Sequence, residues 1–249
     1  MVIISIEKFI IRRENLSHIS KEMDCLAMFK SMLKVKAVIF DMDGLMINTE
    51  HIGNMICVKS NKKFGYEITE KMLFDLIGRN SQSARLYFNK VFGKDYPYDE
   101  IKKENVRLKK EYYKTHDLEV KPGLYQLLDY LKNNEIKMAV ASSTISELVI
   151  KNLKEIHADH YFDCIIGGDQ IVNGKPDPEI FLKALKLLGV KNDEAVVLED
   201  SKNGILASYN ANIPVICIPD IVKHTNDILE KTYMVIDRLD HVIDYIGKL

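Results

Sequence analysis

Two aspartates, Asp41 and Asp43, stand in an Asp-x-Asp-Gly turn directly after the apolar run at 35–40. The β-branched run predicts a buried strand, and Gly44 has the backbone freedom that a sharp turn at the end of that strand needs. In open α/β sheets, ligands bind at the carboxyl ends of the strands. Two carboxylates this close repel each other, so the motif indicates a bound cation, and we expect the oxygen-seeking Mg²⁺. The alternative is a strand followed by an ordinary acidic turn.

Three further groups of polar residues come at the ends of apolar runs or just before a helical pattern. They are Ser142 after 137–141, Lys175 in the Gly-Lys-Pro-Asp-Pro segment at 174–178, and Glu199 with Asp200 after 195–198. Strands that alternate with helices predict parallel βαβ units, whose strands all end along one edge of the sheet. We therefore expect these side chains to meet in space.

With these motifs in this order, the chain resembles the haloacid dehalogenase superfamily of phosphotransferases, in the branch of phosphatases and β-phosphoglucomutases with a helical cap. The resemblance covers roughly residues 35–240. Its motifs are Asp41-Met42-Asp43-Gly44, Ser142, Lys175, and Glu199-Asp200-Ser201 continuing to Asn203-Gly204. It implies an α/β fold with a Rossmann-like parallel-sheet core and a helical cap domain inserted after the first strand.

The resemblance also assigns catalytic roles. Asp41 would attack phosphorus to form an aspartyl-phosphate, and Asp43 would protonate the leaving oxygen and then activate water. Ser142 would hydrogen-bond the phosphoryl oxygens, and Lys175 would offset the repulsion between the phosphoryl group and Asp41. For Asp43 the alternative is an Asx-turn carboxylate that binds nearby backbone N–H groups.

The same resemblance implies a Mg²⁺ site. Its ligands would be the carboxylates of Asp41 and Asp200 and the backbone carbonyl of Asp43, with Glu199 bound directly or through water. The two adjacent acids have a second interpretation, in which they cap the helix that begins near Ser201, and both roles can coexist.

The interval between Asp43 and Ser142 is too long for a simple crossover between strands. Helical patterns within it predict a small helical cap, at 52–64, 69–77, 81–92 and 98–113. We expect an N-terminal appendage at 1–33, a catalytic core at 34–48 and 119–249, and a cap at 49–118, with linkers near 47–51 and 117–122.

Substrate specificity is expected to come from the cap. The polar turn at 78–82 faces the core in related caps, so Arg79 and Asn80 are candidates to hold the distal anionic or polar part of a substrate. A solvated arginine at a helix end is the alternative. Ser143 beside the phosphoryl site, and Glu50 near the entrance, are further candidates for substrate binding.

Composition excludes several partners. The 249 residues include 35 basic and 36 acidic side chains, with a net charge of -1. Such a chain has no net positive potential to attract nucleic acid or acidic membrane surfaces. No stretch reaches the ~20 apolar residues of a membrane span, and no secretory signal is recognisable. The scattered cysteines indicate thiols in a reducing compartment. We expect a cytoplasmic enzyme for a small phosphorylated metabolite, and a monomer or weak homo-oligomer.

Three functions fit these motifs. The first is a Mg²⁺-dependent phosphatase for a sugar phosphate or nucleotide-like monophosphate. The second is a β-phosphoglucomutase-type phosphomutase, but that branch has a histidine about a dozen residues after the nucleophile, where this chain has Gly53, with His51 nearest. The third is a non-catalytic phosphate-binding regulator, which the intact set of catalytic residues disfavours. A dehalogenase is disfavoured because that branch lacks the second aspartate of the first motif.

Overall fold

The computed structural model describes residues 35–76, 81–220 and 224–246, and a six-stranded parallel sheet forms their core. The strand order is β3-β2-β1-β4-β5-β6. The strands are β1 (Ala37–Phe40), β2 (Lys137–Ala141), β3 (Cys164–Ile166), β4 (Ala195–Glu199), β5 (Val215–Cys217) and β6 (Met234–Val235).

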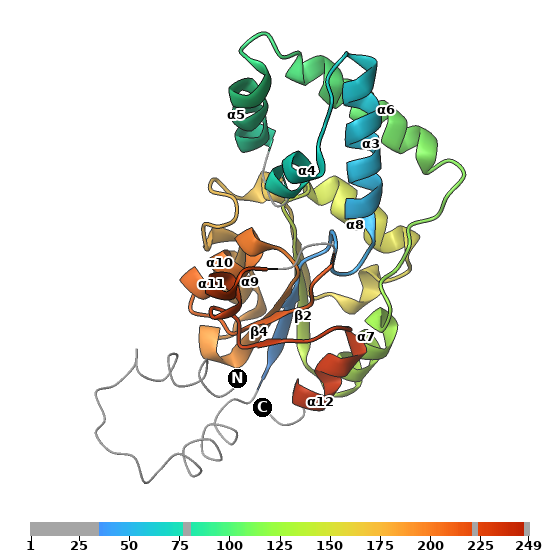
Figure 1. Ribbon diagram of the computed structural model, residues 1–249. Coiled ribbons are helices and arrows are strands. Elements are labelled where there is room, and N and C mark those ends of the chain that lie inside the picture. The colour runs from blue at the N-terminus through green and yellow to red at the C-terminus, as the bar shows by residue number, and fades with distance from the viewer. Residues whose placement is uncertain (1–34, 77–80, 221–223, 247–249) are drawn as a thin grey trace, which may run out of the picture.

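Helices cover the sheet and build a separate layer at its carboxyl edge (Figure 1). The helices of that outer layer are α3 (Thr49–Lys63), α4 (Glu70–Leu76), α5 (Ser81–Phe92) and α6 (Tyr98–Tyr112). Those of the core are α7 (Leu124–Asn133), α8 (Ser146–Glu155), α9 (Glu179–Leu188), α10 (Lys202–Asn210), α11 (Asn226–Leu229) and α12 (Ile243–Ile246). Short 3-10 turns lie at Asp159–Tyr161, Gly168–Gln170, Asn192–Glu194 and Asp240–Val242.

The register of the central strands brings the predicted motifs to one edge. Phe40 at the end of β1 pairs with Val140 of β2 and with Leu198 of β4. All four residues of β1 are buried, as expected for a central parallel strand with helices on both faces. Alternate residues serve opposite faces, so Val38 and Phe40 pack in one apolar core cluster and the neighbouring β1 positions in the other.

The core helices follow the apolar periodicity of the sequence. Four leucines of α7, spaced as on one face of a helix, are all buried: Leu124, Leu127, Leu128 and Leu131. Helix α9 begins at Glu179, directly after Asp177 and Pro178. The Oδ1 atom of Asp177 accepts the backbone N–H of Glu179, the first residue of this helix, at 3.0 Å.

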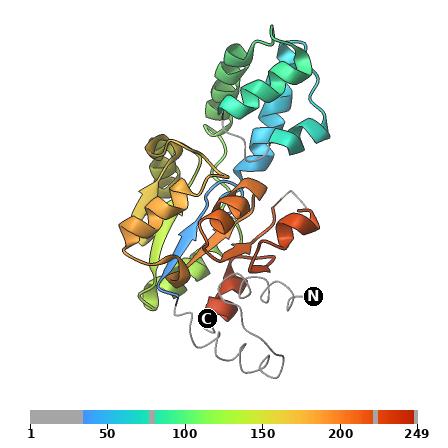
Figure 2. The same ribbon diagram turned by 90° about the vertical axis from the view of Figure 1, so that its left-hand side faces the viewer.

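Helices α3 to α6 form a cap beyond the carboxyl edge of the sheet, and Figure 2 shows the same division from the side. Stacked aromatic rings fill the interior of this cap, for example Phe88 and Tyr96 with centroids 4.8 Å apart. The two chain segments that join cap and core run side by side: Ile47 forms a bridge with Val120, and the backbone N–H of Asn48 donates to Glu119 at 2.8 Å. The predicted fold class is confirmed, while the exact domain boundaries stay predictions. Over these residues, we find no helix that is both long and apolar enough to span a bilayer.

Candidate active site

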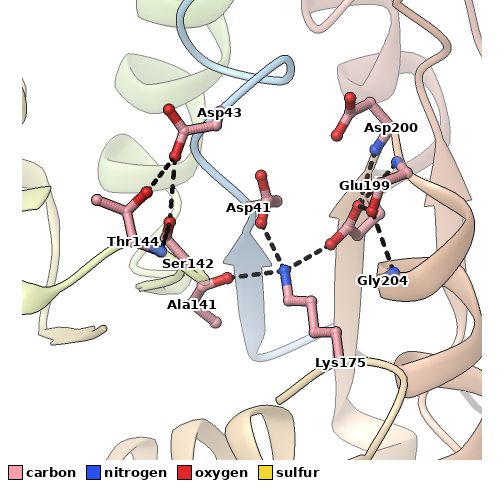
Figure 3. Close-up of polar contacts among 10 residues, drawn as sticks. Asp41, Asp43, Ala141, Ser142, Thr144, Lys175, Glu199, Asp200 and Gly204 are labelled. Atoms are coloured by element: carbon pink, nitrogen blue, oxygen red, sulfur yellow. Dashed lines mark hydrogen bonds and ion pairs between the residues drawn. The ribbon is translucent and has the colours of Figure 1, made fainter. Parts of the chain in front are cut away.

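A buried lysine and two buried carboxylates meet at the ends of β1 and β4 (Figure 3). The Nζ of Lys175 donates to Oδ1 of Asp41 at 2.5 Å, to Oε1 of Glu199 at 2.6 Å and to the backbone carbonyl of Ala141 at 3.0 Å. Lys175 comes from the segment before α9, so three separate parts of the chain meet here. The predicted juxtaposition of Asp41 and Lys175 is present.

Burial governs the ionisation of this cluster. It raises the pKa of Asp41 to about 8, against the lowering effect of the adjacent Lys175 ammonium. Burial alone would lower the pKa of Lys175, but the carboxylates of Asp41 and Glu199 outweigh it and hold that pKa above its usual range. Lys175 is therefore a permanent cation, whereas Asp41 needs further positive charge nearby to remain fully ionised at neutral pH.

Oxygen ligands for such a charge lie close together. Asp41, Glu199 and Asp200 are all buried, and one carboxylate oxygen of each lies within 4.8 Å of the others. A donor set made only of carboxylate oxygens suits a hard cation such as Mg²⁺. The residues present thus fit a divalent metal ion.

The loop after β4 is arranged around Glu199. Its Oε2 accepts the backbone N–H groups of Asp200 and Ser201 and the Ser201 hydroxyl, each at 3.0 Å. Ser201 also caps α10, because its Oγ accepts the N–H of Gly204 at 3.1 Å. A Cβ on Gly204 would lie 1.7 Å from Oε1 of Glu199, so only glycine lets the helix approach this closely. The helix cap expected from the two acids is thus supplied mainly by Ser201.

Asp43 is held by hydroxyl groups. Its Oδ1 accepts from Thr49 at 2.6 Å, and its Oδ2 accepts from Thr144 at 2.8 Å and from Ser142 at 3.4 Å. In Figure 3 the Asp43 carboxylate points toward Thr144 and Ser142, and Lys175 lies beyond Asp41. Gly44 has a φ of 89°, the left-handed backbone that the tight turn was expected to need. In the described parts of the chain, the side chain of Asp43 accepts hydrogen bonds from hydroxyl groups. The alternative role of Asp43, an Asx-turn carboxylate, would instead use backbone N–H donors.

A pocket of about 290 Å³ lies between core and cap at this point. From the core it is lined by Asp41, Asp43, Ser142, Ser143, Thr144, Lys175, Ser201 and Asn203. From the cap it is lined by Thr49, Gly53, Asn54, Leu73, Leu76 and Lys109. The pocket thus joins the reactive carboxylates to a wall that belongs to the cap.

The structure brings together every predicted core residue of the site. Of the predicted cap residues, Arg79 and Asn80 lie outside the described residues. Glu50 lies in the first turn of α3, and its side chain is likewise outside the described part of the chain. Sequence reasoning missed Thr49 and Lys109, which line the pocket from α3 and α6. The place of Thr49 could have been predicted from its position just before the first helical pattern of the cap. The sequence gives no indication that Lys109 lines the pocket, because its place depends on how α6 packs.

Fold and site together define an α/β enzyme with a capped, acid-rich pocket at the carboxyl edge of a parallel sheet. Residues 38–218 match the haloacid dehalogenase-like hydrolase family, and the chain belongs to that family. The expected family membership is thereby confirmed. The expected enzyme class, a phosphoric monoester hydrolase, is confirmed by relatives in this family that are phosphatases.

Relatives in the family act on phosphorylated compounds. The chain is 32% identical over 179 residues to a phosphorylated carbohydrates phosphatase of Thermotoga maritima. The aligned region covers 72% of this chain and 82% of the relative. It is 27% identical to phosphoglycolate phosphatase 1 of Pseudomonas aeruginosa, over 82% of this chain and 77% of the relative. Among solved structures, β-phosphoglucomutase of Clostridium difficile superposes with a TM-score of 0.70 at 26% identity, over 86% of this chain and 96% of that one.

Proposed function

We propose that this protein is a Mg²⁺-dependent phosphatase that hydrolyses a small phosphorylated metabolite, a sugar phosphate or nucleotide-like monophosphate, through an aspartyl-phosphate on Asp41. The observation that carries the proposal is the buried Asp41 carboxylate, which faces the pocket with one oxygen on Lys175 and with Glu199 and Asp200 beside it. A pocket of about 290 Å³ is small for a ligand site, which supports a small substrate.

The carboxylates of Asp41 and Asp200 and the backbone carbonyl of Asp43 would hold the Mg²⁺. Glu199 would reach it through water, because its two oxygens already accept from Lys175, from two backbone N–H groups and from the Ser201 hydroxyl. When bound, the ion neutralises negative charge on the phosphoryl oxygens.

In the first step, the Asp41 oxygen that is not bonded to Lys175 forms a bond to phosphorus, and the phosphorus–oxygen ester bond breaks. Asp43 gives its proton to the departing oxygen, which leaves as an alcohol. The charge of Lys175 offsets the repulsion between Asp41 and the phosphoryl group, and Ser142 would hydrogen-bond the phosphoryl oxygens. The hydroxyls of Thr49 and Thr144 orient the Asp43 carboxyl.

In the second step, water bonds to phosphorus and the bond to Asp41 breaks. Asp43 takes the proton from this water, which returns both aspartates to their starting state and releases inorganic phosphate. One ester and one water thus become one alcohol and one phosphate. Division into two displacements lowers the barrier of a reaction that direct attack by water performs slowly.

A phosphomutase is the second candidate, favoured by the likeness to β-phosphoglucomutase. Gly53 argues against it. Gly53 lines the pocket, and a Cβ built on it meets no atom within 4 Å, so open space stands where that branch has a histidine. Open space in the pocket that also holds Asp41 supports access of water and hence hydrolysis.

The test is a screen of phosphorylated metabolites and p-nitrophenyl phosphate, with phosphate release as the readout. We expect turnover with Mg²⁺, loss of turnover in excess EDTA and recovery when Mg²⁺ is restored. Asp41→Asn should lose turnover yet show a cooperative thermal unfolding transition, since Lys175 keeps its bond to Glu199. Wild-type inactivity on every ester would contradict the function, and full activity in EDTA would contradict the metal.

A further inference from the structure

His224 contacts the loop that carries Asp200. Its Nε2 donates a hydrogen bond to the backbone carbonyl oxygen of Asp200, and the two atoms are 2.6 Å apart. Because a carbonyl oxygen can only accept, Nε2 must carry a proton in this arrangement. His224 is half-buried and is not among the residues that line the pocket. It therefore touches a proposed metal ligand without lining the space in which a substrate would bind.

The peptide unit between Asp200 and Ser201 is held at both of its polar groups. Its carbonyl oxygen accepts from His224, and its N–H donates to Oε2 of Glu199 at 3.0 Å. The same Oε2 accepts the N–H of Asp200 at 3.0 Å, and Figure 3 shows the Glu199 carboxylate facing the backbone of this loop. A peptide unit is planar, so it cannot rotate without breaking both of its bonds. These contacts together fix the backbone from which the Asp200 carboxylate projects.

The simpler explanation for His224 is that it anchors helix α11, which begins two residues later at Asn226. This helix has anchors of its own. Ile228 is buried in the apolar core, and α11 packs against α10 (Figure 1). The carbonyl of Thr225 accepts the first N–H groups of the helix, from Ile228 and Leu229. Docking of α11 therefore does not account for an imidazole placed on the carbonyl of Asp200.

We propose that His224 is a positioning residue for the metal site, whose hydrogen bond holds Asp200 in the orientation that binds Mg²⁺. This inference rests on the proposed function, because that function makes Asp200 a ligand of the ion. An Asp200 that was free to move would have to be ordered when the ion binds, which costs conformational entropy. Removal of the groups that hold metal ligands typically lowers metal affinity or activity by about 10–100-fold.

The experiment measures Mg²⁺ binding apart from catalysis. The thermal unfolding midpoint of protein freed of metal with EDTA is recorded against Mg²⁺ concentration, and its rise gives an apparent Kd for each variant. His224→Phe keeps a ring and removes the donor, whereas His224→Gln keeps an N–H donor on a flexible side chain. His241→Phe is the matched control, because the His241 ring contacts Asp237, at 2.8 Å, instead of a site residue.

We expect His224→Phe to raise the apparent Kd for Mg²⁺ about tenfold. His224→Gln should restore most of the affinity, and His241→Phe should bind Mg²⁺ as the wild type does. Turnover of p-nitrophenyl phosphate by His224→Phe should be low at limiting Mg²⁺ and recover at saturating Mg²⁺, because the variant loses affinity and no catalytic group. A purely structural role would instead lower the midpoint in EDTA and leave the Mg²⁺ dependence unchanged.

Two results overturn the inference alone. One is a folded His224→Phe protein with wild-type affinity for Mg²⁺. The other is failure of both His224→Phe and the smaller His224→Ala to fold, because His224 would then be a structural residue. A wild type that Mg²⁺ does not stabilise overturns the metal site and the inference together. Inactivity of the wild type on every ester overturns the phosphatase function and leaves the Mg²⁺ binding result standing.

Discussion

The hydroxyl of Thr49, the first residue of cap helix α3, donates a 2.6 Å hydrogen bond to Oδ1 of Asp43 in the core. The two residues lie on either side of the segment that leads into the cap, where Ile47 bridges to Val120 of the returning segment. A displacement of the cap that moves the start of α3 must therefore stretch or break the bond that fixes Asp43. The position of the cap and the orientation of the proposed acid–base group are thus physically linked.

Thr49→Val tests this link. It keeps the shape of the side chain and removes the donor, and a hydrogen bond typically contributes about 0.5–1.5 kcal/mol. We expect kcat with p-nitrophenyl phosphate to fall about tenfold, the equivalent of about 1.4 kcal/mol in activation free energy. Thr49→Ser keeps the donor and should restore most of the rate.

Thr115→Val is the matched control for this change. Thr115 lies near the other segment between cap and core, and its hydroxyl donates to the backbone carbonyl of Tyr112 at 3.3 Å instead of to a site residue. It should leave kcat within about twofold, in line with the small effects of most surface substitutions. A Thr49→Val enzyme with wild-type kcat would show that Asp43 needs no support from the cap.

Lys175→Met is expected to destabilise the fold as well as stop turnover. The change leaves Asp41 and Glu199 buried beside each other without their shared cation, and breaking a buried ion pair from one side costs about 3–5 kcal/mol. The free energy of unfolding is measured by urea denaturation in EDTA. The double variant Lys175→Met/Glu199→Gln should recover part of the loss, because one uncompensated charge is then removed.

An exposed pair serves as the control for Lys175. Lys36 binds Glu194 at 2.6 Å, with side chains that are 51% and 26% exposed, and such pairs contribute about 0–1 kcal/mol. Lys36→Met should therefore change the free energy of unfolding far less than Lys175→Met. Equal effects of the two changes would mean that burial does not set the strength of the Lys175 interactions.

The sequence predicted the parts of the site that depend on strand order. Asp41, Ser142 and Asp200 each follow an apolar run, and parallel pairing alone brings the ends of those runs together. It could not predict which hydroxyls hold Asp43, because that depends on side-chain directions within two turns about 100 residues apart. Nor could it place Lys109 on the pocket, since helix α6 has polar residues on several faces and its rotation is set by packing against α3.

Acid should weaken the cap through Glu104. This buried carboxylate joins α3 to α6, and hydrogen bonds from Arg107, followed by Lys63, lower its pKa to about 2. A carboxyl whose pKa is depressed by folding adds stability above its unfolded pKa near 4.3, and that stability is lost as the pH falls toward 2. Glu104→Gln should thus differ most from the wild type at neutral pH, and progressively less below about pH 4.5.

The measurement is the urea midpoint of both proteins at several pH values between 7 and 3. Glu111→Gln is the control, because Glu111 binds the same Arg107 with a side chain that is 59% exposed. It should shift the midpoint little at any pH. A difference between wild type and Glu104→Gln that stays constant down to pH 3 would refute the assigned role of this carboxylate.

The last prediction separates hydrolysis from phosphoryl transfer to a sugar. A mutase must keep water away from the aspartyl-phosphate until a sugar hydroxyl arrives, whereas a phosphatase lets Asp43 activate water directly. The open space at Gly53 favours water. With β-glucose 1-phosphate as substrate, we expect inorganic phosphate, if any product, and no glucose 6-phosphate, even when a bisphosphate primer is added. Both products are quantified in the same reaction. Formation of glucose 6-phosphate faster than phosphate release would make the protein a mutase. Another group would then have to take the role of the histidine that the mutase branch has at the position of Gly53.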